Sequence, residues 1–377
     1  MIAWEEAVVA DAADGVNGIQ ELSVELPDGT RAKAILYCDE HGRAEAGDRV
    51  LLNVTAVRKR LGSGGVHFVH AVLKSGERDP SGRFLTRGTN AEGAGHLMKL
   101  RYTSLQRAVL AAEEPDSPYH ELFREVRPLD GMPVLIGELH SMLPAAVCWL
   151  VRSAAVRGGR PPRIVYIMSD GGALPLAFSR HAAALRRLGW ICGTVTYGHA
   201  YGGDLETMNK YSALTAARHV LAADIAIAAM GPGIAGTGTP LGHTGVETGE
   251  IAHAVRQLGG RPVLIPRVSF ADVRDRHRGI SHHLLAVLKH VVAFPVALPL
   301  PSSLTAEQKA VIERQFSAAG CGGGHRIDWV EGIDPAEVER ALEAYHERVT
   351  SMGRGFAEDP AFFLSVCAAA EAAAEHL

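Results

Sequence analysis

Residues 163–198 read RIVYIMSDGGALPLAFSRHAAALRRLGWICGTVTYG, and this stretch decides the fold class. It begins with a short apolar run, passes through two glycines into an amphipathic stretch, and ends in a second apolar run. A continuous apolar run of this length is typical of a strand that is buried on both faces. Two such strands joined by a helix form the unit of a parallel sheet. The stretch therefore predicts a strand, a helix and a second, parallel strand.

The same rhythm recurs from Pro133 onward, so we expect one large α/β domain over residues 131–377. Its predicted fold class is α/β, with a doubly wound, mainly parallel, Rossmann-like sheet of about six or seven strands. In the tail we expect a strand at Ile327–Val330, a helix near Pro335–Val349 and an Ala-rich helix at Pro360–His376 for packing or dimerisation. The repeating pairs of apolar run and helix are PVLIGEL with SMLPAAVCWLVRSAAV, WICGTVTYG with DLETMNKYSALTAARHVLA, DIAIAAMG with VETGEIAHAVRQLGG, RPVLIPRVS with ISHHLLAVLKH, and VVAFPVALPL with LTAEQKAVIERQFSAAG.

The first 74 residues show a different pattern, with short β-rich segments separated by turn signals and no helix between them. This pattern predicts a small β-barrel-like, OB-like domain over residues 1–74. Residues 75–130 are expected to be a linker or long loop, with a connecting helix at about Ser104–Ala112. The predicted strands of the first domain are Trp4–Ala10, Ile19–Leu26, Arg31–Cys38, Arg49–Val57 and Val66–Leu73.

Composition excludes several classes of protein. The 377 residues contain 38 Lys and Arg against 42 Asp and Glu, so no basic excess drives general binding to nucleic acid or anionic membranes. The apolar run near Val291–Pro301 is too short to span a bilayer, and the first residues lack the basic flank of a signal peptide. Five scattered cysteines without CxxC spacing fit reduced thiols, so a cytoplasmic location is expected.

Polar and glycine-rich residues collect after the predicted strands rather than before them. Because ligands of open parallel sheets bind at the carboxyl ends of the strands, this asymmetry predicts a single site at that edge. Glu138 and His140 follow the first strand of the domain, and Asp170 with Gly171 and Gly172 follows the second. Asp170 is a candidate acid/base group, and the two glycines allow a ligand to approach closely. The alternative is an Asp helix cap followed by turn glycines.

The loop Met230–Glu250, MGPGIAGTGTPLGHTGVETGE, holds seven glycines and four threonines before a helix expected to begin near Gly245 or Val246. Such a loop can bind a phosphate or carboxylate through its backbone N–H groups. It matches neither G-x-G-x-x-G nor the P-loop, so a standard dinucleotide or ATPase site is disfavoured. The alternative is a long loop whose glycines only satisfy turns. The predicted ligand-binding residues here are Gly231, Gly233, Gly236, Thr237, Gly238, Thr239, His243, Thr244 and Gly245.

A third loop contains His199 and Asp204, which together suit a general base with its orienting carboxylate, or two metal ligands. Asp204 equally suits the N-cap of a helix beginning at Leu205. His199, Asp170 and Asp204 are the predicted catalytic residues. No G-x-S-x-G motif is present, and Cys148 and Cys192 fit buried, inert thiols.

The run RVSFADVRDRHRGISHH, residues 267–283, is dense in arginine and histidine. Guanidinium groups pair bidentately with phosphate and carboxylate, so a small anionic ligand is predicted. The alternative is a solvated turn in which two Asp neutralise the arginines. Ser281 is expected to cap the next helix, and at most one of the adjacent histidines to face the ligand. The predicted ligand-binding residues here are Arg267, Ser269, Arg276 and His282, with Arg274 and Arg278 as further candidates.

Metal binding stays an open alternative, and no cofactor is assigned. Candidate side chains at the edge are numerous, but no HExxH, HxH or CxxC spacing is present. In the first domain, Arg58-Lys59-Arg60 lies near few stacking aromatics, so binding of single-stranded nucleic acid is disfavoured. A substrate lid or an oligomerisation module is the preferred role for that domain. The histidines and acids at the proposed edge are Glu138, His140, His199, Asp204, His243, Glu247, His282 and His283.

Several long motifs resemble a bacterial family known as domain of unknown function 3866. They are GHLMKLRYT from Gly95, DGGALPLAFSR from Asp170, YGHAYGGDLE, the glycine loop at 230–250 and the run 267–283, together with GDRVLLNVTAV in the first domain. The resemblance spans nearly the whole chain. The family has no assigned activity, so the resemblance implies a name and no reaction.

The leading functional hypothesis is a cytoplasmic enzyme, a transferase or hydrolase, acting on a small anionic metabolite that is phosphorylated or nucleotide-like. The alternatives are a non-catalytic metabolite sensor and a divalent-metal-dependent hydrolase. Expected partners are the small metabolite and a second copy of the chain in a homodimer, with no membrane and no nucleic acid.

Overall fold

The structure is a computed structural model that describes residues 2–15, 17–60, 65–73, 95–103, 105–321 and 324–377. Residues 75–94 and 104 of the expected linker, and residues 62–64 of the glycine hairpin at 62–65, lie outside the described residues. The chain divides into two compact units, residues 1–92 and 93–377, each described here by itself.

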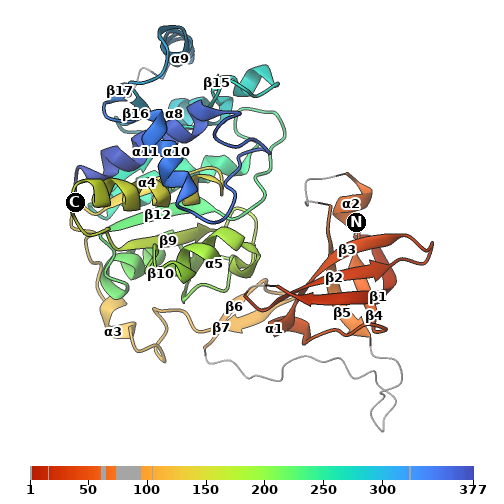
Figure 1. Cartoon of the computed structure of the whole chain (residues 1–377). Coiled ribbons are helices and arrows are strands. Elements are labelled where there is room, and N and C mark those ends of the chain that lie inside the picture. The colour runs from red at the N-terminus through yellow and green to blue at the C-terminus, as the bar shows by residue number, and fades with distance from the viewer. Residues whose placement is uncertain (1, 16, 61–64, 74–94, 104, 322–323) are drawn as a thin grey trace. The chain divides into compact units, whose positions relative to one another are not determined.

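The first unit is a closed barrel of five strands in the order β1-β2-β3-β5-β4 (Figure 1). Antiparallel pairing of the first strand with the fourth closes it. Its interior is filled by alternating aliphatic side chains, among them Leu22, Leu36 and Leu52. The small β-barrel predicted from the sequence is thus confirmed. Its elements are β1 (Trp4–Asp14), β2 (Ile19–Glu25), β3 (Arg31–Tyr37), α1 (Cys38–His41), β4 (Arg49–Asn53), α2 (Thr55–Arg58) and β5 (His67–Leu73).

The second unit is built on a six-stranded sheet in the order β11-β10-β9-β12-β8-β13, in which every pair is parallel. The predicted parallel α/β sheet is confirmed, while its doubly wound, Rossmann-like character stays a prediction. The strands are β8 (Pro133–Gly137), β9 (Ile164–Ser169), β10 (Gly193–Tyr197), β11 (Leu205–Thr207), β12 (Ile225–Met230) and β13 (Arg261–Leu264).

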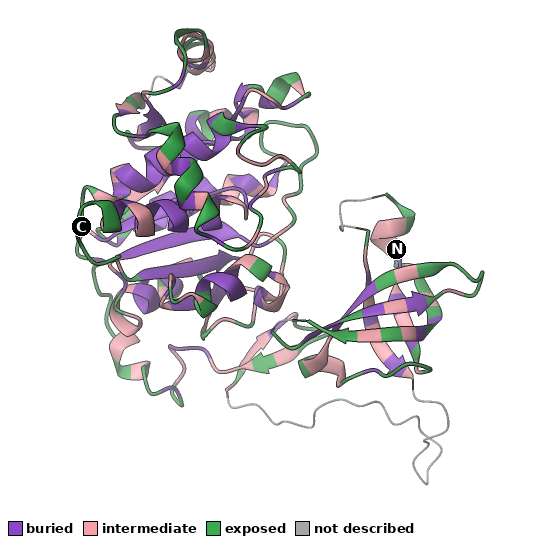
Figure 2. Ribbon diagram, viewed as in Figure 1, coloured by how far each residue is buried: buried purple, intermediate pink, exposed green. Residues whose placement is uncertain are grey.

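Helices cover both faces of this sheet because alternate strand residues bury toward opposite sides. Ile164, Tyr166 and Met168 of β9 belong to one apolar core, whereas Val165 and Ile167 belong to the other. Figure 2 shows the strands buried between the two layers. The first core includes α4 (Met142–Val156), α5 (Arg180–Arg187), α10 (Pro335–Glu343) and α11 (Pro360–Ala374), and the second α6 (Lys210–Thr215), α7 (Glu247–Gln257) and α8 (His282–His290).

The remaining elements complete the second unit. The parallel pair β16–β17 stands apart from the six-stranded sheet, which the sequence did not predict. The Ala-rich α11 is buried along most of its length and packs on α4, so it is a packing helix within the chain. The other elements are β6 (Leu97–Lys99), β7 (Arg107–Val109), α3 (His120–Phe123), β14 (Val268–Ser269), β15 (Gly279–Ile280), β16 (Ala297–Pro301), α9 (Ala306–Ala318) and β17 (Arg326–Val330).

Four local predictions were wrong. No helix was expected between the strands of the first unit, but α1 follows β3 and α2 follows β4. In place of the helix expected at Ser104–Ala112, residues 107–109 form strand β7, paired antiparallel with β6. The helix expected from Leu205 begins at Lys210 with Asn209 as its cap, because residues 205–207 join the sheet as β11. The strand expected over Arg49–Val57 ends at Asn53 and is followed by α2. Among the described residues, no helix is long and apolar enough to cross a membrane.

Candidate functional site

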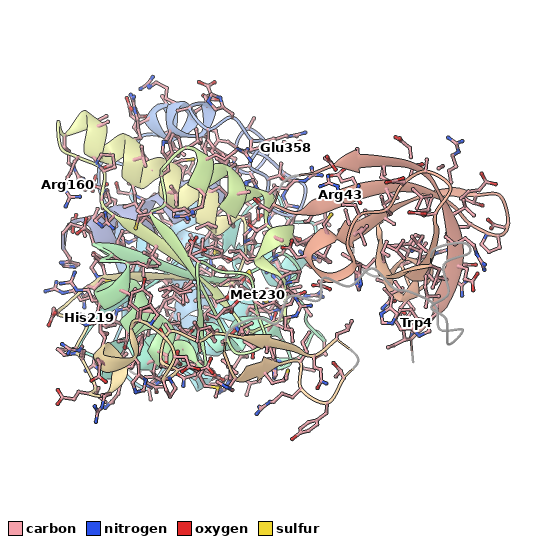
Figure 3. The ribbon with its side chains drawn as sticks, turned by 90° about the horizontal axis from the view of Figure 1, so that it is seen from below. Trp4, Arg43, Arg160, His219, Met230 and Glu358 are labelled. Atoms are coloured by element: carbon pink, nitrogen blue, oxygen red, sulfur yellow. The ribbon has the colours of Figure 1, made fainter. Side chains whose placement is uncertain are left out.

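Strand order decides which loops meet at the carboxyl edge of the sheet. β8 lies between β12 and β13, so the residues that follow these three strands become neighbours. β10 lies two strands away from β12, which separates its loop from that group. In Figure 3, Met230 marks the carboxyl end of β12, and Arg160 and His219 lie on the side of the opposite strand ends.

Glu138, directly after β8, is at the centre of the group. It is buried, and its Oε1 accepts a hydrogen bond of 3.0 Å from Nη1 of Arg267, which follows β13. Its Oε2 lies 3.5 Å from Nδ1 of His283 in the first turn of α8. Burial raises the pKa of this carboxyl, but His283 and Arg267 together outweigh burial and leave the pKa below its usual value. Glu138 is therefore a buried carboxylate.

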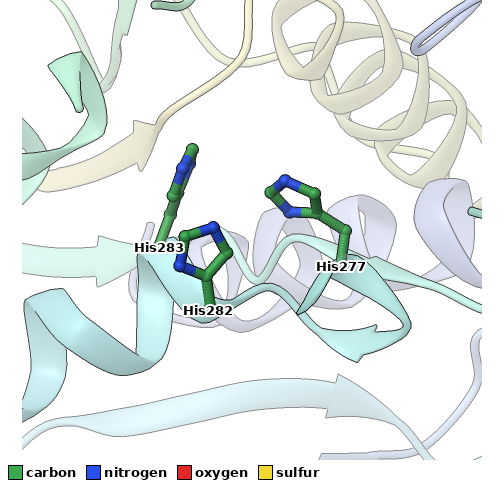
Figure 4. A group of neighbouring side chains, drawn as sticks. All are labelled: His277, His282 and His283. Carbon is green, nitrogen blue, oxygen red and sulfur yellow. The ribbon is translucent and has the colours of Figure 1, made fainter. Parts of the chain in front are cut away.

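Three histidines of the run 267–283 gather around the start of α8. His277 comes from a short 3-10 turn, Asp275–His277, and His282 and His283 from the helix itself (Figure 4). The ring centroids of His282 and His283 are 4.4 Å apart, and that of His277 lies 4.9 and 5.1 Å from them. Of the two adjacent histidines, His283 lines the cavity described below and His282 does not, although both have ring nitrogens within 4.8 Å of one on His277.

The pKa values of three imidazoles at this edge are lowered. Burial, followed by the charges of Arg267 and Arg274, lowers the pKa of His277 to about 3. Burial and the neighbouring His283 lower the pKa of His282 to about 4. Burial likewise lowers the pKa of His243, which comes from the glycine loop after β12. A neutral imidazole keeps a nitrogen lone pair for a proton or a metal ion.

Two sets of side chains could hold a metal ion among the described residues. In each set, one ligand atom per residue lies within 4.8 Å of the others. The two sets share His283. The first set is Glu138, His243 and His283, and the second set is His277, His282 and His283.

A cavity of about 190 Å³ opens beside the histidines. Two of its three arginines have carboxylate partners: Arg267 pairs with Glu138, and Arg274 forms a bidentate pair with Asp272. Arg276 is exposed and makes no ion pair with any residue that the structure describes. The lining includes Gly236, Arg267, Arg274, Arg276, His277 and His283.

A second cavity, of about 430 Å³, lies at the amino edge. It is larger, but each arginine at its rim has an acidic partner. Arg160 pairs with Asp224 at 3.3 Å, Arg218 with Asp130 at 3.8 Å, and Arg157 with Glu371. The carboxyl-edge cavity, whose Arg276 has no carboxylate partner among the described residues, is therefore the better candidate for chemistry.

The glycine loop is largely folded onto itself. The N–H of Thr237 donates to the carbonyl of Gly242 at 2.7 Å, and that of Thr244 to Ala235 at 2.9 Å. The hydroxyls of Thr237 and Thr239 lie 3.0 Å apart within the loop. A short 3-10 turn, Thr244–Val246, precedes α7, which begins at Glu247.

The predicted glycines of this loop have different surroundings. Gly236 and Gly238 line the cavity. Gly231 packs near Met168 and Leu174, and Gly233 has a φ of +116°. Gly245 faces Glu138 and His243, so it lies against the buried carboxylate rather than in the open cavity.

The three predicted catalytic residues lie outside the lining of this cavity and have structural partners. Asp170 Oδ1 accepts from the N–H of His199 at 2.6 Å, and His199 Nδ1 accepts from the N–H of Leu100 at 3.0 Å. Asp204 accepts from the N–H and hydroxyl of Thr194, at 2.7 and 2.8 Å, and pairs with Arg186. Its alternative role as a helix cap was wrong, because strand β11 follows it.

Three further predicted residues, Gly171, Gly172 and Ser269, do not line the cavity. Gly171 packs near Met230 and Glu247, and Gly172 near Leu174, outside the cavity lining. The Ser269 hydroxyl donates to Oδ2 of Asp359 at 2.6 Å, which fixes the 267–283 loop to the tail.

Sequence reasoning chose His282 rather than His277 or His283 as the ligand-binding histidine of the run, and it named His283 only among the candidates for a metal site. It also missed Met352, which lines the cavity from the tail. The density of histidine in the run was the usable signal for His277 and His283. The sequence carried no comparable signal for Met352.

The fold and this edge define an α/β protein with a small β-barrel unit and a cavity lined by arginine and histidine. Residues 33–370 match the family described as protein of unknown function (DUF3866), so the chain belongs to that family. No curated protein and no solved structure gives a significant match to the chain.

Proposed function

We propose that the chain is a hydrolase acting on a small phosphorylated metabolite, bound in the cavity at the carboxyl edge of the sheet. The observation that carries this proposal is the unpaired Arg276 in a cavity whose other arginines are neutralised. With Arg267 and Arg274 paired, Arg276 leaves the cavity with an uncompensated positive charge. A phosphate group supplies the matching negative charge and acceptor oxygens.

The size of the cavity favours a small substrate. The cavity has a volume of about 190 Å³. Typical pockets for larger organic ligands measure about 300 to 1,000 Å³. A transferase that works through a ternary complex must hold two substrates together, whereas a hydrolase needs one substrate and water. The volume therefore favours hydrolysis over group transfer between metabolites.

In the proposed reaction, water adds across a phosphate ester. A new bond forms between phosphorus and the water oxygen, the bond from phosphorus to the leaving oxygen breaks, and a water proton passes to that oxygen. His277 is the general-base candidate because its ring lines the cavity and its Nδ1 lies 2.9 Å from the hydroxyl of Ser281. It replaces His199 and Asp170, whose hydrogen bonds serve the loops.

Finer assignments belong to the same proposal. We regard the sheet as doubly wound and Rossmann-like, which agrees with a ligand at its carboxyl edge, and the barrel as OB-like. The five cysteines form no disulfide, which fits the reducing bacterial cytoplasm that we assign to this enzyme. Homodimer formation stays a proposal.

The test uses a panel of small phosphate monoesters, including glycerol phosphate and p-nitrophenyl phosphate, with release of phosphate as the readout. Arg276→Ala is expected to lower kcat/KM by about 10-fold or more, since it removes a charged hydrogen-bond donor. Arg278→Ala is the matched control, because Arg278 is also exposed but does not line the cavity. Equal activity of the two variants, or no turnover of any ester, contradicts the proposal. Phosphate binding without turnover identifies a sensor instead.

A further inference from the structure

We propose that Glu138, His243 and His283 form a binding site for one divalent first-row transition-metal ion of the zinc class. The three residues follow β8, precede α7 and begin α8, respectively. All three are buried, and one ligand atom from each lies within 4.8 Å of the other two. Binding of the ion does not depend on the proposed function, but its use in hydrolysis does.

The protonation state of His243 is fixed by its backbone contact. Its Nε2 lies 3.0 Å from the carbonyl oxygen of Pro240, and a carbonyl can only accept a hydrogen bond. Nε2 therefore carries the proton, and Nδ1 carries a lone pair. That Nδ1 is buried and has no hydrogen-bond partner, in a side chain whose residue is 8% exposed. A backbone carbonyl behind the ring is the usual way in which proteins orient a metal-binding histidine.

His283 presents a second nitrogen without a hydrogen bond. Its ring stacks on that of His243, with centroids 3.8 Å apart and planes 6° from parallel. Its Nδ1 is buried and lies 3.5 Å from Oε2 of Glu138, beyond ordinary hydrogen-bond length.

Glu138 completes the set as the anionic ligand. Arg267 holds Oε1 at 3.0 Å, which orients the carboxylate and leaves Oε2 directed toward the histidines. Gly245 adds an independent indication. A Cβ at this position would lie 2.8 Å from Oε2 of Glu138 and 3.0 Å from Nδ1 of His243, so both ligand atoms lie beside one point.

The ligand types select the class of ion. Two imidazole nitrogens and one carboxylate oxygen suit zinc, iron, cobalt or manganese, whereas magnesium and calcium prefer oxygen ligands alone. Leaving the two nitrogens unpaired in the interior costs free energy, which coordination of an ion would recover. Three protein ligands leave a coordination position for water, as in catalytic zinc sites. Because His283 also lines the cavity, the ion would lie next to the proposed substrate.

The test measures metal content of the full-length chain. Protein stripped with EDTA is dialysed against Zn²⁺, Co²⁺ or Mg²⁺, and bound metal is determined by elemental analysis. We expect one Zn²⁺ or Co²⁺ per chain and no stoichiometric Mg²⁺. His243→Ala and Glu138→Gln should weaken Zn²⁺ binding by more than about 100-fold, since loss of even an outer-shell partner costs 10- to 100-fold. His67→Ala is the matched control, because His67 is buried and has an unpartnered Nδ1 but belongs to the barrel.

Circular dichroism establishes that each variant is folded. If His243→Ala does not fold, the visible spectrum of bound Co²⁺ is compared between the unaltered chain and Glu138→Gln. A difference between the two spectra requires Glu138 near the ion, as proposed. Absence of stoichiometric Zn²⁺ and Co²⁺ in the unaltered chain overturns the proposal. Binding that survives Glu138→Gln but is lost in His277→Ala also overturns it, because the ion would then lie with His277 and His282. Phosphate-ester hydrolysis by a metal-free chain would leave the proposed function standing and overturn only the use of the ion in hydrolysis.

Discussion

The imidazole of His243 lies parallel to that of His283, with their ring centroids 3.8 Å apart. Forty residues separate the two along the chain, and the contact joins the glycine loop after β12 to the first turn of α8. Because both rings also face Glu138, the stack brings three chain segments together around one buried carboxylate. This arrangement is the basis for the predictions about the site.

Gly245→Ala should weaken metal binding without removing a ligand. The added Cβ would crowd Glu138 Oε2 and His243 Nδ1, at 2.8 and 3.0 Å, so both ligand atoms must shift. We expect Zn²⁺ affinity to fall by about 10-fold or more, as for other changes behind a metal ligand. Gly159→Ala is the control, because its Cβ would meet only ordinary contacts. Equal Zn²⁺ affinity of the two folded variants would contradict the geometry described for this site.

Lys99→Met should destabilise the second unit strongly. Lys99 is 1% exposed, and its Nζ donates to Oε2 of Glu206 at 2.6 Å and to the carbonyl of Ala200 at 2.5 Å. Removing one partner of a buried ion pair leaves the other charge uncompensated and typically costs about 3 to 5 kcal/mol. Urea denaturation measures the loss. The double variant Lys99→Met/Glu206→Gln should recover part of it, and a loss below about 1 kcal/mol would show that the pair is not buried as described.

Asp272→Asn should lower stability at pH 7 and have less effect in acid. The hydrogen bonds from Arg274 outweigh burial and hold the pKa of Asp272 below its ordinary value of 3.8. The folded state therefore keeps this carboxylate ionised where the unfolded chain protonates it. The resulting stabilisation is fully present above pH 3.8 and is lost as pH falls toward the folded-state pKa.

We expect a loss of about 2 kcal/mol at pH 7, typical of hydrogen bonds to a charged group. Urea titrations of the unaltered chain and the variant at pH 7 and pH 3 test the sign of the effect. A difference in the free energy of unfolding that grows in acid would show that Asp272 is not stabilised as an anion.

The sheet could be predicted because each strand is a short apolar run that helices bury on both sides. The same local reasoning failed at residues 205–207, where LET lacks an apolar run and forms an edge strand only because β10 offers a free edge. It also failed at residues 107–109, which pair with a strand before them. In both cases pairing with another segment overrides local propensity.

From the sequence, the candidate site could be predicted only as the carboxyl edge of the sheet, with a set of residues expected to lie there. The sequence placed His199, His243 and His283 on that edge, but strand order decides which of them meet. β12 and β8 are neighbours, so His243 reaches Glu138, whereas β10 is separated from β12 by β9. Strand order is a long-range property, and the residue spacing of a single chain does not reveal it.

Titration calorimetry with inorganic phosphate tests the central claim, an anion site around Arg276, most directly. The measurement uses EDTA-treated full-length chain at low ionic strength, so that a metal ion does not contribute. We predict one phosphate per chain, with affinity reduced about 10-fold or more in Arg276→Ala and unchanged in Arg278→Ala. Absence of phosphate binding, or an equal loss of affinity in both variants, would contradict the assignment of this cavity.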